Sequence, residues 1–154
     1  YGDWSSDVCS SDLRTDMNQR SVHDNFLVAY EVDSTRKVIV LHTQFRDREP
    51  YEHTDIVFSG VEAYHFVGDN MQTILLDVAE TTTEQVMEQF AKEFENGIRY
   101  CWPGQWNKSK EACRRHFQER AVKGWTISSA FGGGGFVIAK TMQSNDAGGQ
   151  QPPP

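Results

Sequence analysis

The residues from Glu52 to Glu80 constrain the fold most, because short β-branched and aromatic runs alternate there with turn residues. Side chains of a strand point alternately to opposite faces, and in the first run Thr54, Ile56 and Phe58 fall on one face. Turn-forming residues, Ser59-Gly60 and Gly68-Asp69-Asn70, separate the runs. This pattern predicts strands at residues 53–58, 61–67 and 73–78, joined by short connections as in an antiparallel meander.

Two more runs precede this stretch and are joined by a turn at residues 33–36. Asp33 and Ser34 can close that turn through their own side chains, so residues 25–32 and 37–45 predict a hairpin. In the second run both faces are largely apolar, which predicts a central strand covered on both sides for part of its length.

After Glu80 the apolar period changes from two to about 3.6 residues, which predicts helices. Thr81 stands three residues before Glu84 and predicts a capping box at the start of a helix that ends at Asn96-Gly97. A second helix is predicted at residues 109–122, followed by strands at 125–129 and 136–140. The glycine run 132–135 precedes a strand rather than a helix, so it predicts a hairpin or glycine bulge and not a phosphate-binding loop.

These elements predict an α+β domain over residues 23–142, with a mostly antiparallel sheet of about seven strands and two helices packed on one face. Residues 14–22 and 143–154 are polar and aperiodic, and we expect a disordered lead and a disordered tail there. Residues 2–13, GDWSSDVCSSDL, resemble an in-frame translation of a sequencing adapter. We therefore expect residues 1–13 to contribute nothing to the domain.

Charge is unevenly distributed along the chain, whose formal net charge is −7. Acidic residues prevail from Asp24 to Glu80, and basic residues prevail from Lys108 to Lys140. The net negative charge does not indicate nucleic-acid binding by the whole chain. The basic helix by itself is more often a solvated face. The acidic half could instead attract and steer a basic protein partner.

The chain has no apolar run of the ~18 residues that a membrane span needs, so we expect no membrane association. Outside the adapter-like segment the cysteines are Cys101 and Cys113, which lack CxxC spacing and favour free thiols in a reducing compartment such as the cytoplasm. Cys113 shares a helix face with His116, but that face is also the apolar stripe. We therefore expect a core thiol there rather than a thiol–imidazole pair.

The candidate binding residues lie in turns and in the aromatic connector, not within the strands. Carboxylates at the rim of the sheet suit a basic partner, and tryptophans of the connector could line a ligand site. These candidates are Asp47, Glu49, Glu52, Asp69, Trp102 and Trp106.

Histidines on different predicted strands offer an alternative site of another class. His42 and His65 could converge with Asp55 and hold a metal ion, as a small metal-dependent or hydrolase-like enzyme would require. No HExxH or HxH motif supports this set. The imidazoles of strand histidines are more often hydrogen-bonded to backbone groups or carboxylates than to a metal ion. No motif indicates a cofactor.

The order of motifs resembles a small family of uncharacterised bacterial α+β proteins. The resemblance covers residues 23–142 and rests on DNFLVAYEVD, IVLHTQFRDREPYEHTDIVFSGVEAYHF, ILLDVAE, the WPG connector and ISSAFGGGGFVIAK. In layout the chain is also similar to the small immunity proteins of bacterial toxin systems. The family resemblance implies no activity and assigns no functional residue. The uneven charge and the lack of a catalytic motif lead us to expect a non-enzymatic, immunity-like protein-binding domain.

Overall fold

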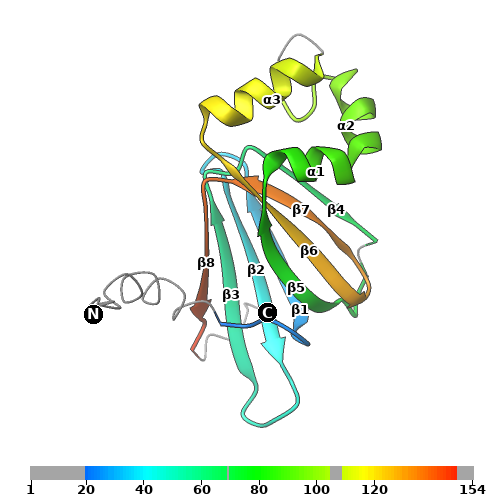
Figure 1. Ribbon diagram of the computed structural model, residues 1–154. Coiled ribbons are helices and arrows are strands. Elements are labelled where there is room, and N and C mark those ends of the chain that lie inside the picture. The colour runs from blue at the N-terminus through cyan, green and yellow to red at the C-terminus, as the bar shows by residue number, and fades with distance from the viewer. Residues whose placement is uncertain (1–19, 69, 105–108, 149–154) are drawn as a thin grey trace, which may run out of the picture.

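The computed structural model describes residues 20–68, 70–104 and 109–148, which form a single antiparallel sheet of eight strands with three helices at one end (Figure 1). The predicted α+β class and antiparallel sheet are confirmed, but the sheet has eight strands where about seven were predicted, and there are three helices where two were predicted. The order across the sheet is β4-β7-β6-β5-β1-β2-β3-β8. The elements are β1 (Phe26–Asp33), β2 (Val38–Phe45), β3 (Glu52–Ser59), β4 (Ala63–Val67), β5 (Ile74–Thr81), α1 (Thr83–Gln89), α2 (Ala91–Ile98), α3 (Lys110–Glu119), β6 (Lys123–Phe131), β7 (Gly134–Ala139) and β8 (Thr141–Asp146).

The additional strand is β8, which follows β7 after Lys140 and pairs with β3 from Thr141↔Ser59 to Asp146↔Thr54. Residues 143–146, which the sequence predicts as tail, therefore belong to the sheet. They are polar because β8 is an edge strand with mostly exposed side chains, and such a strand needs few apolar residues.

The additional helix arises because the predicted helix from Thr81 to Gly97 is broken at Phe90, whose backbone (φ −110°, ψ 35°) is not helical. The break lets both α1 and α2 direct apolar residues into one cluster, and the Phe90 ring packs 4.8 Å from that of Phe136. The predicted capping box is present but one residue later: Thr82 accepts from the Gln85 N–H, and the Gln85 side chain accepts from the Thr82 N–H.

The sheet bends so strongly that its two halves, β1-β2-β3-β8 and β5-β6-β7-β4, face each other. Ring contacts cross the interior, with Phe58 of β3 5.7 Å from Trp125 of β6 and Tyr30 of β1 5.1 Å from Phe66 of β4. The buried apolar residues between the halves are Val22, Ile39, Leu41, Ile56, Phe58, Leu75, Trp125, Ile127, Val137 and Ala139.

The helices cover the outer side of β7 and its neighbours, so β7 is buried on both faces. Its residues alternate: Val137 and Ala139 face the interior, while Phe136 and Ile138 join the helical cluster. The sequence predicts a central β2 covered on both sides for part of its length, and β2 does lie inside the sheet, between β1 and β3. The β2 residues Ile39, Leu41 and Thr43 are buried on the inner face, but the residues between them are only half-buried.

The glycine run 132–135 provides room for close packing at the β6–β7 turn. Gly135 has φ +147°, and a Cβ there would overlap the His65 carbonyl oxygen of β4. A Cβ on Gly134 would lie 2.8 Å from the Ile127 carbonyl oxygen of β6. The predicted hairpin is present, and its glycines are required for strand contact on both sides.

We expect Gly135→Ala to lower the free energy of unfolding by at least about 3 kcal/mol, because β4 and β7 must separate to admit the methyl group. Urea denaturation measures the change. Gly148→Ala is the control, since nothing lies within 4 Å of a Cβ at that position. Equal stability of the two variants would contradict the packing argument.

A half-buried carboxylate, Glu62, ties the helices to the sheet between β3 and β4. It receives hydrogen bonds from Lys37 Nζ at 3.0 Å and His116 Nε2 at 3.2 Å, and Arg120 Nη1 lies 3.8 Å away. Burial by itself would raise the pKa of Glu62, but the bonds from Lys37 and His116 and the charges of Lys37 and Arg120 outweigh it. The pKa of Glu62 therefore lies below its usual value.

We expect Glu62→Gln to destabilise the protein by about 1–2 kcal/mol at neutral pH. A carboxylate with a lowered folded-state pKa stabilises the fold above its unfolded pKa and loses this effect as the pH falls through the folded value. The difference between wild type and Glu62→Gln should therefore shrink below the ordinary pKa of 4.5. Denaturation at several pH values checks this, with exposed Glu88→Gln as control. A difference that persists unchanged into the acid range would refute the assignment.

Candidate functional site

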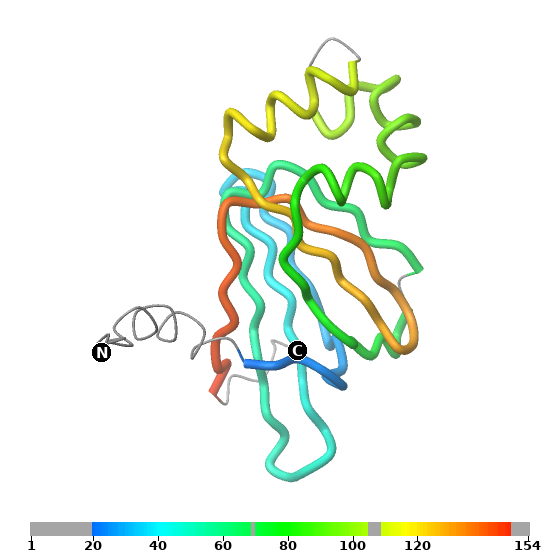
Figure 2. Tube along the Cα trace, in the orientation of Figure 1, coloured from blue at the N-terminus to red at the C-terminus, as the bar shows by residue number. Residues whose placement is uncertain are grey.

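A polar groove of ≈ 490 Å³ opens at the end of the sheet away from the helices. Residues 20–25 cross this end of the sheet from β8 to the start of β1, as Figure 2 shows in dark blue. Val22 anchors the segment in the core, and Asn25 N–H donates to the Val22 carbonyl at 3.1 Å. The groove is lined by Arg20, Ser21, His23, Asn25, Phe45, Arg48, Glu52 and Thr54.

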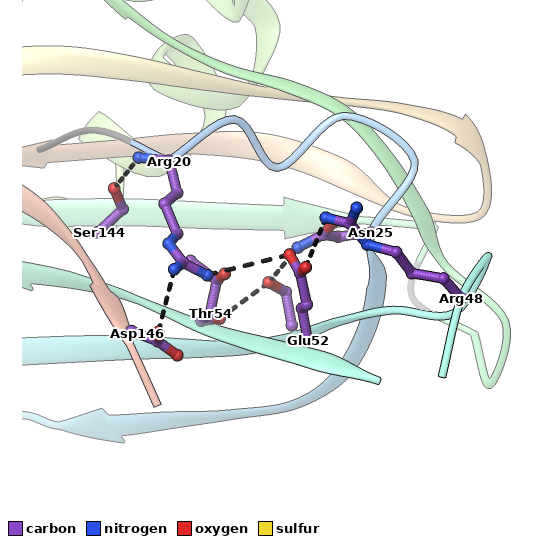
Figure 3. A network of polar contacts seen from close by, with 8 residues as sticks. Arg20, Asn25, Arg48, Glu52, Thr54, Ser144 and Asp146 are labelled. Atoms are coloured by element: carbon purple, nitrogen blue, oxygen red, sulfur yellow. Dashed lines mark hydrogen bonds and ion pairs between the residues drawn. The ribbon is translucent and has the colours of Figure 1, made fainter. Parts of the chain in front are cut away.

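A line of alternating charges runs along the groove (Figure 3). Glu52 lies between Arg48, at 2.5 Å, and Arg20, at 3.9 Å, and Arg20 also pairs with Asp146 at 3.0 Å. All four side chains are 40% or more exposed. Exposed ion pairs contribute about 0.2–1 kcal/mol each, so these groups can exchange partners with an incoming charged molecule at low cost.

The floor of the groove is a buried chain of polar groups. Asn25 Nδ2 donates to Thr43 Oγ1 at 2.8 Å, and Thr43 Oγ1 donates to the Thr54 carbonyl at 2.8 Å (Figure 3). Asn25 also accepts the Leu75 N–H through its backbone oxygen at 2.9 Å. This chain fixes the segment 20–25 against β2 and β3, and so fixes the shape of the groove.

We expect Thr43→Val to destabilise the protein by about 1–3 kcal/mol, because the buried Asn25 amide loses its acceptor while the volume stays the same. Thr141→Val, on the exposed edge strand, is the control and should change stability little. Thermal unfolding compares the two. Similar melting temperatures for both variants would show that the polar chain does not hold the segment.

The rim of the groove is the turn between β2 and β3, where the cations lie against the sheet. Arg46 Nε donates to Gln44 Oε1 at 2.7 Å, and its guanidinium lies 4.4 Å above the Phe26 ring. Among the described residues, Asp47 and Glu49 have no hydrogen-bond or ion-pair partner and are exposed. Of the three predicted rim carboxylates, Glu52 is therefore paired within the protein, while Asp47 and Glu49 face solvent.

A histidine with a carboxylate partner and a serine lie along the described lining of the groove. The His23 ring pairs with Asp24 at 2.9 Å, because Asp24 has φ 63° and turns its carboxylate back toward the ring. Ser21 Oγ accepts the His23 backbone N–H at 3.3 Å. The His23 imidazole therefore has a carboxylate partner, and the described contact of the Ser21 hydroxyl is to the backbone N–H of His23.

The predicted metal-binding set does not form one site. His42 Nδ1 lies 2.8 Å from Asp55 Oδ1, and His42 Nε2 lies 3.4 Å from Glu31, on neighbouring strands. His65, on β4, instead packs against the rings of Trp102 and Phe136. Within the described ranges, no group of three or more His, Cys, Asp or Glu residues could hold a metal ion.

The other predicted residues lie elsewhere. Trp102 packs on Phe94 at 5.2 Å within the helical layer, so it contributes to packing there and does not line the groove. Asp69 and Trp106 fall outside the described residues. Cys113 is buried as expected, and burial raises the pKa of its thiol to about 12, which keeps it protonated.

Sequence reasoning missed Arg20, which lines the groove, and its ion-pair partner Asp146. Both were assigned to disordered ends, yet the Arg20 N–H donates to Ser144 Oγ at 2.9 Å across 124 positions of the chain. The available signals were Val22, an apolar residue in a polar lead, and Met142, which packs against the core at the start of β8.

Comparison of the chain with protein-family models, curated proteins and solved structures finds no match. Among the described helices, none is long and apolar enough to cross a membrane. The geometry of the groove and its rim is therefore the basis for assigning a function.

Proposed function

We propose that the protein is a non-enzymatic binding domain that holds a basic protein partner at the rim of the groove. The observation that carries this proposal is the arrangement of the β2–β3 turn. Its arginines are held by Gln44, Phe26 and Glu52, whereas Asp47 and Glu49 remain exposed. The turn therefore presents net negative charge to an approaching molecule.

The groove supports the same proposal through its exchangeable ion pairs. A partner's Lys or Arg can compete with Arg20 or Arg48 for Glu52, since these exposed pairs are weak. Complementary charge also raises the rate of association and rejects partners of the wrong sign. The resemblance to small immunity proteins supports a partner of this kind, and the free thiols Cys101 and Cys113 suit a reducing compartment such as the cytoplasm.

We expect the double variant Asp47→Lys/Glu49→Lys to slow association with the partner about tenfold or more at low salt. The partner is first captured by cross-linking to the full chain, and surface plasmon resonance then measures its association rate at several salt concentrations. The difference between wild type and variant should narrow as salt rises, because exposed charges are screened.

The matched control is Glu88→Lys/Glu95→Lys, which makes the same change of charge on exposed positions of α1 and α2. Its association rate should stay close to that of wild type. A rim variant that associates at the wild-type rate, or a control that slows equally, would remove the rim as the binding surface.

A further inference from the structure

A row of apolar side chains lies beside the rim on the outer face of the sheet. Directly opposed residues of antiparallel strands share a face, and the register pairs Phe26 of β1 with Ile74 of β5 and Ile74 with Phe131 of β6. The next row, which contains Leu27 and Leu75, points into the core instead. We call Phe26, Ile74 and Phe131 the apolar strip.

The apolar strip is open to solvent at Phe131, which is 57% exposed, whereas Phe26 and Ile74 are half-buried. Val28 and Leu76, two residues further along β1 and β5, are 40% and 37% exposed. The helices lie at the other end of the sheet and pack against Phe136 and Ile138 (Figure 1). Clustered exposed apolar residues with a polar border are typical of protein–protein contact sites.

The strip is continuous with the rim. Phe26 lies opposite Gln44 of β2, and the Arg46 guanidinium, bonded to Gln44, covers part of the Phe26 ring at 4.4 Å. Asp47 follows Arg46 directly. The exposed carboxylates of the turn and the aromatic residues of the strip therefore belong to one surface.

An acidic residue also lies beside the strip on the other side of Phe26. Asp24 precedes Phe26 by two residues and is exposed. Residues 67–78 and 124–139, which include most of β5, most of β6, β7 and their turns, contain two aspartates and no Lys or Arg. Arg46 lies over Phe26, and the carboxylates of Asp24, Asp47 and Glu49 are the groups near the strip that suit positive charges on a partner.

We propose that the apolar strip is the central contact for the partner, and that it takes an apolar side chain flanked by Lys or Arg. This inference rests on the proposed function and specifies it: the rim attracts basic residues, and the strip buries the apolar residue between them. Burial of an aromatic ring supplies binding energy that exposed charge pairs do not.

Three synthetic peptides of equal length test the proposal by NMR titration of the labelled full chain. The first places Phe between lysines, the second replaces Phe with Ser, and the third replaces the lysines with Glu. The first should bind at least about tenfold more tightly than the second. Its amide shift changes should centre on Phe26, Ile74 and Phe131, and the third should bind most weakly.

The matching protein variant is Phe131→Ser, with Leu76→Ser as a second variant in case the first is unstable. Either should reduce affinity for the Phe peptide about tenfold and leave affinity for the Ser peptide unchanged. Tyr100→Ser removes a side chain that is 85% exposed beyond α2 and serves as control. Melting curves confirm that the variants fold.

The outcomes separate this inference from the proposed function. If both basic peptides bind equally and Phe131→Ser binds like wild type, the strip is not the contact, although the acidic rim still is. If neither basic peptide binds, both proposals fail. If the chain instead self-associates in sedimentation experiments and Phe131→Ser abolishes this, the strip contacts a second copy and the inference is overturned.

Discussion

The junction of β1 and β5 at Phe26 and Ile74 is the constraint on which the rest of the structure depends. Backbone bonds from Leu27 N to Thr73 O and from Leu75 N to Asn25 O, each 2.9 Å, close it locally before the two strands diverge. Because the sheet bends there, Leu27 and Leu75 contribute to an interior enclosed by both halves. The same bend leaves Phe26 and Ile74 on the outer side, away from the helices, so the core and the exposed apolar strip have one cause.

Local patterns in the sequence predict which residues form strands and helices, but not which strands become neighbours. The alternation of Thr54, Ile56 and Phe58 and the capping signal near Thr82 are local, and the structure contains both elements. The pairing of β4 with β7 and of β3 with β8 joins residues that are 67–92 positions apart, which local patterns do not indicate. Double burial was therefore expected for β2, whose composition is apolar, and is found for β7, whose position in the sheet places the interior on one side and helices on the other.

The residues of the candidate site also fall into two groups: those that a local sequence pattern indicates, and those that only the fold brings together. The turn carboxylates Asp47, Glu49 and Glu52 are close in sequence, so the sequence could indicate them as a group. Arg20 and Asp146 could not be found in this way, because each acquires its role only when the two ends of the described chain meet beside β3. The histidine set failed for a related reason: His42 and Asp55 are true neighbours across β2 and β3, whereas His65 belongs to the half of the sheet that carries the helices.

The rim and the apolar strip act on a partner over different distances. Because they lie close together, one can affect the approach of a partner and the other its binding. Exposed charges act over about 8–10 Å at physiological salt, so Asp47 and Glu49 influence a partner before contact and affect mainly its rate of association. Apolar surface contributes once water is excluded, so Phe131 and its neighbours affect mainly the lifetime of a complex. An acidic rim alone would bind many basic molecules briefly, and an apolar strip alone would favour self-association. Placed side by side at one end of the sheet, the two together select a partner that carries basic and apolar residues in the matching order.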